Sequence, residues 1–158
     1  MPGLQVFGIP GLPEVENGAD LGALILEAAA AAGTPLENGD VVVVTSKIVS
    51  KAEGQTVELA DVEVSPFARQ YAERMEKDPA IVELVLRQSK RVVRQVGPIL
   101  ITETHHGFIC ANAGVDHSNT STDPDIVLLL PKDPDASARA LRDGLARTLG
   151  VRMPIVLA

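Results

Sequence analysis

Carboxylate and amide side chains gather in residues 110–119, on a glycine-containing loop that follows a predicted apolar strand. A strand end presents the chemistry of an α/β protein, and Asp116 there would supply the hard oxygen that Mg²⁺ or Mn²⁺ prefers. Asn119 would donate hydrogen bonds to a phosphate or a base. The same residue types also crowd ordinary Asx turns, which form for backbone reasons alone. Since one aspartate does not make a metal site, residue types alone favour the ordinary turn.

A second polar stretch, Thr-Ser-Lys-Ile-Val-Ser-Lys at 45–51, follows a run of four valines. A lysine at such a strand end would neutralise phosphate charge, and the hydroxyls would bind phosphate or a metal-bound water. Two solvated lysines on a surface turn are the plainer alternative. The pattern Gly-x-x-x-x-Gly-Lys-Ser/Thr is absent from the whole chain, so any nucleotide must bind by another route than a P-loop.

The remaining reactive residue types give weaker signals. His105, His106 and His117 match no zinc spacing, and we expect them at turns or rims. Cys110 has no base partner that the sequence can assign, so a nucleophilic role is not predicted. The basic residues at 87–94 are expected on the solvated side of a helix, although such a face could also meet a phosphorylated ligand. No catalytic residue is assigned from these patterns.

Alternating strand and helix signals must position these groups. A Gly/Pro loop at 8–13 follows a predicted strand, and prolines at 10 and 13 exclude helix there. Four consecutive valines at 41–44 predict a strand covered on both faces. The signals do not repeat as regular βαβ units, so we predict a mixed α/β (α+β) fold, a mixed sheet with packed helices. Helices are predicted at 20–32, 66–77, from 79 onward and at 134–149, and strands at 4–9, 41–45, 98–104, 107–111, 127–130 and 151–158.

Composition limits the classes of function. Hydrophobic residues make up 46% and charged residues 22% of the 158, which is typical of a globular chain with one core. A net charge of −7 argues against nonspecific nucleic-acid binding. No signal peptide or membrane-length apolar run is present, and a single cysteine cannot form an internal disulfide. We therefore expect a soluble cytoplasmic domain without nucleic-acid or membrane partners.

Four ordered motifs run through the chain: Gly-Leu-Pro at 11–13, Val-Val-Val-Thr-Ser-Lys-Ile-Val-Ser-Lys-Ala-Glu-Gly at 42–54, Asn-Ala-Gly-Val-Asp-x-Ser-Asn at 112–119 and Leu-Leu-Leu-Pro-x-Asp-Pro-Asp-x-Ser-Ala at 128–138. With these motifs the chain closely resembles the coenzyme F420-0:L-glutamate ligase family, also called F420 gamma-glutamyl ligase. The resemblance extends from Val6 to Ala158, which is nearly the whole chain.

The resemblance implies an amide-forming ligase that uses GTP and the divalent cations Mg²⁺ or Mn²⁺. Such an enzyme attaches L-glutamate to the phospholactyl end of the coenzyme F420 precursor, by way of an acyl phosphate, and can extend the tail through gamma-carboxyl linkages. The family also implies a homodimer. Carried over position by position, it assigns Asp116 to metal binding, Lys51 to phosphate binding, and Pro10, Gly11, Leu12, Pro13, Thr45, Ser46 and Asn119 to nucleotide binding.

Family members continue beyond the strand at 151–158, into an Asp-Thr pair and a C-terminal part with further metal and nucleotide groups. We therefore expect residues 1–158 to form a single domain, the N-terminal portion of such a ligase, incomplete relative to the family fold. The alternative to a ligase is a catalytically incomplete fragment that acts only as a nucleotide- or metal-binding or dimerising module. Loss of covering elements would leave apolar strands such as 41–44 exposed.

Overall fold

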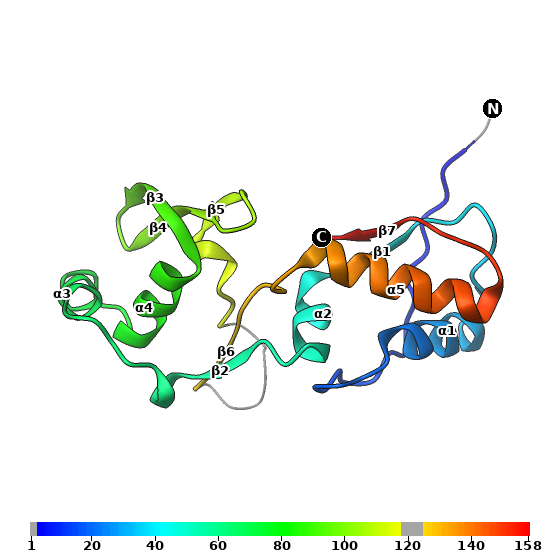
Figure 1. Ribbon diagram of the computed structural model, residues 1–158, viewed down its shortest axis with the longest axis horizontal. Helices are drawn as coiled ribbons and strands as arrows, with labels where there is room; N and C mark the ends of the chain where they lie inside the picture. The colour runs from blue at the N-terminus through cyan, green and yellow to red at the C-terminus, as the bar shows by residue number, and fades with distance from the viewer. Residues whose placement is uncertain (1–2, 118–124) are drawn as a thin grey trace. The chain divides into compact units, whose positions relative to one another are not determined.

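The computed structural model describes residues 3–117 and 125–158, which fall into two compact units (Figure 1). Unit 1 joins the described part of Met1–Gly54 to Pro131–Ala158, and unit 2 is Gln55–Leu130. Helices alternate with short sheets, and both parallel and antiparallel strand pairs occur. This confirms the predicted mixed α/β class, whereas the single domain over 1–158 stays a prediction. In the described ranges no helix has the length and apolar character of a membrane span.

Unit 1 packs the three helices of its described residues against one parallel strand pair. The chain order is α1 (Leu21–Ala31), β1 (Val42–Val44), α2 (Ser46–Ala52), α5 (Pro134–Leu149) and β7 (Ile155–Leu157). Both long helices begin as the sequence predicts, since Asp20 accepts a hydrogen bond from the amide of Ala23 and Asp133 from that of Ala136. Its core joins Ile25 of α1 and Leu145 of α5 to valines of β1.

One face of the strand pair β1–β7 is open. Val42 and Val44 are buried in the unit 1 core, but 65% of Val43 and 45% of Val156 are exposed. These two residues are register partners and therefore point to the same side. The prediction that the four valines are covered on both faces is thus wrong for the described residues, because α1 and α5 cover only one side.

Unit 2 holds two antiparallel sheets and a pair of helices. Its order is β2 (Thr56–Glu58), η1 (Leu59–Asp61), α3 (Pro66–Met75), α4 (Pro79–Arg87), β3 (Ser89–Val96), β4 (Ile99–Thr104), β5 (Ile109–Ala111), η2 (Asn112–Gly114) and β6 (Ile126–Leu128). The strands β3, β4 and β5 form one sheet, and β2 pairs with β6. The core lies between the helices and β4, where Tyr71, Val82, Val85 and Leu100 are buried.

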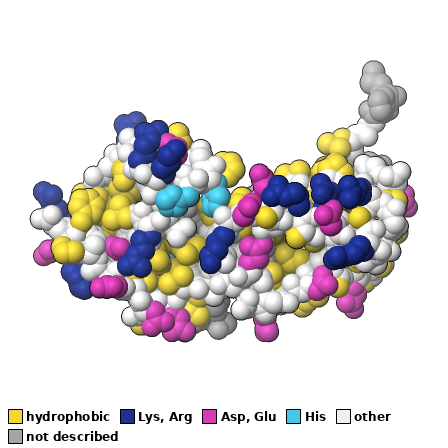
Figure 2. All heavy atoms as spheres, in the orientation of Figure 1, with side chains coloured by type: hydrophobic (Ala, Val, Ile, Leu, Met, Phe, Trp, Pro, Cys, Tyr) yellow, Lys and Arg dark blue, Asp and Glu magenta, His cyan; other side chains and the backbone are white. Residues whose placement is uncertain are grey.

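The basic segment 87–94 is the main local difference from expectation. The helix predicted from 79 onward ends at Arg87, and the next residues form β3 rather than a solvated helix side. Pairing of β3 with β4 along its length overrides the helical spacing of the arginines. Basic side chains gather over β3 in Figure 2 with an acidic group among them. Lys90 and Arg91 both bind Glu103, at 3.2 and 2.6 Å.

Candidate functional site

Thr45 and Ser46 lie where β1 ends and α2 begins. The surface turn of the plainer alternative is not formed, because a helix follows the valines directly, with Thr45 at the position before its first residue. The Thr45 side chain makes no capping hydrogen bond. The amide of Ser46 donates to the carbonyl of Ala158, at 2.6 Å, so β7 fixes the start of this helix. The two hydroxyl residues are therefore set by backbone contacts at the end of the parallel strand pair.

Lys51 lies in the last turn of α2, and its side chain is only 11% exposed. A buried ammonium needs an anionic or hydrogen-bonding partner, because desolvation of an unpaired charge is costly. That partner is the carboxylate of Glu14, with which Lys51 forms an ion pair. Glu14 itself is 75% exposed. Lys51 is therefore not the solvated surface lysine of the plainer alternative.

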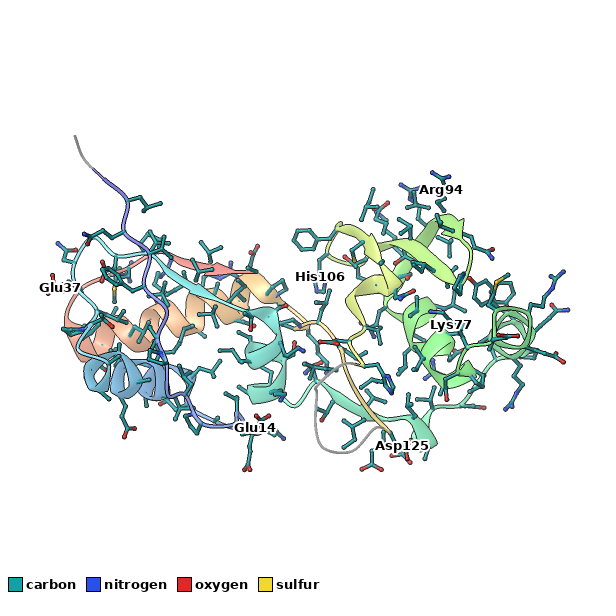
Figure 3. The ribbon with its side chains drawn as sticks, turned by 180° about the vertical axis from the view of Figure 1, so that it is seen from behind. Glu14, Glu37, Lys77, Arg94, His106 and Asp125 are labelled. Carbon is teal, nitrogen blue, oxygen red and sulfur yellow. The ribbon has the colours of Figure 1, made fainter. Side chains whose placement is uncertain are left out.

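The loop of residues 10–13 leads directly to Glu14. Gly11 has a φ of +82°, a left-handed conformation that glycine adopts without strain. Leu12 packs against the unit 1 core, whereas Pro10, Gly11 and Pro13 are exposed. Figure 3 labels Glu14, which lies where this N-terminal segment passes α2. The loop predicted to contact nucleotide and the lysine predicted to bind phosphate thus belong to the same unit, joined by one ion pair.

The segment after Glu14 is held against the C-terminal end of α2. The amide of Gly18 donates to the carbonyl of Ala52 at 2.8 Å. A β-carbon placed on Gly54, whose φ is +63°, would lie 2.7 Å from the side-chain oxygen of Asn17. These contacts do not involve Glu14, so the backbone that carries its carboxylate is positioned independently of the ion pair.

The loop that contains Asp116 has an unusual backbone. Asn112, Ala113 and Gly114 have φ values of +51°, +52° and +70°, which makes three successive residues left-handed. A side chain in this region costs about 1–2 kcal/mol, and such strain concentrates at functional sites. Packing maintains the conformation, because Ala113 is buried and the side-chain oxygen of Asn112 accepts from the amide of Leu100 at 3.3 Å.

Asp116 follows this turn and is half-buried. Its amide donates to the carbonyl of Leu128 at 2.9 Å, and the amide of Leu128 donates back at 2.8 Å. Its backbone is therefore fixed to β6 by a bridge outside the main ladders. Asn119, the predicted nucleotide contact of the same loop, lies outside the described residues. Asp116 belongs to unit 2, while the loop at 10–13, Thr45, Ser46 and Lys51 belong to unit 1.

Within residues 3–117 and 125–158, no group of three or more His, Cys, Asp or Glu side chains is arranged to hold a metal ion. Asp116 thus contributes a single carboxylate. Mg²⁺ is commonly bound by one or two carboxylates together with phosphate oxygens and water, and a lone aspartate fits that pattern. It does not fit a cation held by protein groups alone.

The weaker candidates take the structural places expected of them. His105 and His106 lie in the turn between β4 and β5, and Nε2 of His105 is 2.9 Å from the carbonyl oxygen of Arg87. Cys110 lies on β5, where burial raises the pKa of its thiol and disfavours the nucleophilic thiolate. His117 is exposed. These positions agree with turn and rim roles.

Sequence analysis missed two charged groups with defined partners. Glu14 carries no motif of its own, and only its place beside the Gly-Leu-Pro segment could have drawn attention to it. Glu83 of α4 is buried and accepts hydrogen bonds from the Ser65 hydroxyl at 2.6 Å and from Nε of Arg87 at 2.8 Å. The Ser65 hydroxyl, and next the Arg87 guanidinium, lower the pKa of the Glu83 carboxyl.

Comparison with known proteins gives one consistent result. The sequence model of the family described as F420-0:Gamma-glutamyl ligase matches residues 11–158. Two similar relatives are the proteins named coenzyme F420:L-glutamate ligase from Methanopyrus kandleri, 45% identical, and Methanothermobacter thermautotrophicus, 38% identical, each over 99% of this chain. The relative of the same name from Halorubrum lacusprofundi is 42% identical over 90% of the chain. The chain spans 60%, 61% and 56% of these three relatives' lengths.

Proposed function

Because this chain belongs to the F420-0:Gamma-glutamyl ligase family, we propose that it takes part in joining L-glutamate to the coenzyme F420 precursor, driven by GTP and a divalent cation. The observation that carries this proposal is the family match over residues 11–158. The names of the relatives support the ligase activity and its glutamate substrate. A homodimer and a cytoplasmic location are part of the same proposal.

The chemistry requires activation of a carboxylate. A carboxylate oxygen of the precursor attacks the γ-phosphorus of GTP, so that GDP leaves and an acyl phosphate forms. The amine of L-glutamate then attacks the acyl carbon, inorganic phosphate leaves and the nitrogen loses a proton. Catalysis of phosphoryl transfer rests on positioning and on charge stabilisation, and a divalent cation offsets the negative charge on the transferring group.

The protein groups take their roles from this chemistry. Lys51 would contribute positive charge to a nucleotide phosphate, which its burial in unit 1 strengthens. The exposed loop at 10–13, Thr45, Ser46 and Asn119 would hold the nucleotide. Asp116 would provide a carboxylate to Mg²⁺ or Mn²⁺, and the strained turn before it supports a functional role for that loop. No residue is assigned to proton transfer.

A second candidate function follows from the single carboxylate at Asp116. No cluster of metal-binding side chains supports it among the described residues, so the chain can act as a nucleotide- or metal-binding module without performing the ligation. The two candidates differ in one measurable product. A ligase releases GDP and phosphate in proportion to glutamate incorporated, whereas a binding module yields neither.

Thermal unfolding with GTP and Mn²⁺ tests the binding that both candidates require. A ligand at a hundred times its dissociation constant stabilises the native state by about 2.7 kcal/mol, which raises the melting temperature visibly. We expect a metal-dependent rise that Asp116→Ala abolishes. Asp61→Ala, which removes an exposed aspartate of unit 2, is the matched control and should keep the rise. A cooperative transition unaffected by GTP and Mn²⁺ would contradict the proposal.

A ligation assay then separates the two candidates. The chain is incubated with GTP, Mn²⁺, L-glutamate and the precursor, and the mass of the product is measured along with the GDP released. A product heavier by one glutamyl residue, with one GDP for each amide formed, supports the ligase. Ligand-dependent melting without any product supports the binding module.

A further inference from the structure

We propose that Glu14 is an exchangeable counter-ion of Lys51, which neutralises the ammonium until an anionic phosphate ligand takes its place. Glu14 thereby weakens and tunes the affinity of the site for phosphate. This inference rests on the proposed function, because it takes Lys51 as the phosphate-binding group. It adds a residue that sets affinity, and neither the family motifs nor the relatives' names assign one at this position.

The two members of the ion pair differ sharply in burial. The Lys51 side chain is 11% exposed and that of Glu14 is 75% exposed. Little of the Lys51 side chain is exposed, so an anionic partner is favourable for its ammonium. For Glu14, water is available, and its carboxylate loses little on leaving. Glu14 can therefore leave the ion pair while Lys51 stays in place.

The energy of the pair also suits exchange. An ion pair with a solvent-exposed member contributes little to stability, since solvent screens it and ordering of the side chain opposes it. A phosphate group carries more negative charge than a carboxylate and offers several acceptor oxygens, which makes it the stronger partner for an ammonium. A polyphosphate ligand can thus displace Glu14, and the loss of the pair reduces its apparent affinity by a few-fold.

The backbone around Glu14 does not depend on the pair. Gly18 binds Ala52, and Asn17 lies over Gly54, so the segment after Glu14 stays attached to α2 when the carboxylate moves. Before Glu14, Leu12 packs into the unit 1 core. The carboxylate can therefore swing out by side-chain rotation alone. The exposed loop at 10–13 remains in position to contact the ligand that replaces it.

The test measures binding of inorganic pyrophosphate and of GTP by titration calorimetry at about 0.1 M ionic strength, where the Debye length is about 10 Å. The variants are Glu14→Gln, Lys51→Met and the matched control Glu16→Gln, which removes an equal charge from an exposed side chain two residues away. We expect Glu14→Gln to tighten both dissociation constants by about two- to fivefold. Glu16→Gln should leave them within about 1.5-fold, since a distant charge is screened. Lys51→Met should weaken binding of both ligands by at least about tenfold.

A second readout follows the ion pair itself. Lysines methylated with ¹³C-formaldehyde give one resonance each, and the Lys51 signal is identified by its absence from Lys51→Met. It should shift in Glu14→Gln, and on addition of pyrophosphate to the unchanged chain, but not in Glu16→Gln. Circular dichroism confirms that each variant is folded.

The outcomes separate this inference from the function on which it rests. If Lys51→Met weakens binding by at least about tenfold but Glu14→Gln leaves it unchanged or weaker, Glu14 is not a competing counter-ion, while the phosphate role of Lys51 stands. If the unchanged chain and Glu14→Gln both fail to bind pyrophosphate and GTP, the phosphate role of Lys51 is wrong and the inference falls with it. Tighter binding of both ligands in Glu14→Gln, with Glu16→Gln unchanged, supports the inference.

Discussion

Each unit holds an ion pair between a largely covered side chain and a more exposed one. The covered side chain is a cation in unit 1 and an anion in unit 2. In unit 1 the less exposed member is the cation, since the side chain of Lys51 is 11% exposed and that of Glu14 is 75% exposed. In unit 2 the buried member is the anion, with Glu83 11% and Arg87 48% exposed. The difference lies in what else binds the buried group. These additional contacts distinguish an ion pair that stabilises the fold from one whose exposed member can be replaced by a ligand.

Glu83 is bound from several sides. Its carboxylate accepts from the amide and the hydroxyl of Ser65, at 3.1 and 2.6 Å, and from Arg87 one helical turn later. Arg87 in turn donates to the carbonyl of Glu63. The network ties the start of α3 to α4. Lys51, by contrast, has one partner within the part of the chain that the structure describes, and that partner is mostly in water. A group satisfied by several fixed donors is structural, whereas one satisfied by a single mobile side chain can bind a ligand.

The largest expected effect is on unit 2. Glu83→Ala leaves Ser65 and Arg87 without their acceptor, and we predict a loss of about 2–4 kcal/mol in the free energy of unfolding, measured in urea. Glu73→Ala, at an exposed position of α3, is the control and should change that energy by less than about 0.5 kcal/mol. If Glu83→Ala and Glu73→Ala lower the free energy of unfolding by the same small amount, the Glu83–Arg87 pair does not stabilise the fold and does not differ from the Lys51–Glu14 pair.

Glycine substitutions give the next largest contrast. Gly114 has a φ of +70°, and a β-carbon there would lie 2.9 Å from the side chain of Leu130. At Gly54 the close atoms are the end of the exposed Asn17 side chain, which can rotate away. We predict that Gly114→Ala lowers the free energy of unfolding by about 2 kcal/mol and Gly54→Ala by about 1 kcal/mol. If urea unfolding shows a larger loss for Gly54→Ala than for Gly114→Ala, the loop that contains Asp116 is not rigid.

Acid should weaken unit 2 through Glu83. Hydrogen bonds from Ser65 and then Arg87 hold the pKa of this carboxyl below its usual value. A carboxyl whose folded pKa is lowered stabilises the fold above its unfolded pKa of about 4.3, and this contribution is lost as pH falls through the folded value. The free energy of unfolding should therefore fall below about pH 4.3, and less steeply in Glu83→Gln. If the free energy of unfolding falls equally steeply with pH in the unchanged chain and in Glu83→Gln, Glu83 does not contribute to the sensitivity to acid.

The smallest expected effect is on the stability of unit 1. Glu14→Gln should change the free energy of unfolding by less than about 0.5 kcal/mol, because Glu14 is exposed and its pair with Lys51 is screened. Urea unfolding at low and high salt checks this. A loss as large as that of Glu83→Ala would mean that the Lys51 pair supports the fold and does not exchange.

Local signals predicted much of the fold. Asp20, Ser65, Asp78 and Asp133 each accept a hydrogen bond at the start of the helix predicted after them. The predicted hairpin at 98–111 is the pair β4–β5. Such caps and turns are encoded within a few residues, so a sequence pattern can show them. Tertiary contacts decided the rest, as in β3, where pairing with β4 overrides helical spacing, and in residues 4–9, which form no strand.

The candidate site was predictable only in its separate parts. Sequence patterns placed Lys51 in a polar segment that follows a strand, and Asp116 on a tight loop. The ligand roles of both residues stay predictions. They could not show that Lys51 is buried, nor that Glu14, 37 residues earlier, neutralises it. Burial and long-range pairing depend on how distant segments pack. The left-handed turn at 112–114 was likewise hidden, because Asn112 and Gly114 tolerate such a backbone but Ala113 between them does not signal it.

The central claim is that Lys51 binds nucleotide phosphate, and the most direct test is the affinity of the chain for GTP in the presence of Mn²⁺. Titration calorimetry should compare the unchanged chain with Lys51→Met and with Lys47→Met, a second lysine of the same helix. We predict that Lys51→Met weakens GTP binding by at least about tenfold, as expected for loss of a buried charge-assisted contact, while Lys47→Met has a smaller effect. Equal affinities in the unchanged chain and Lys51→Met would contradict the account.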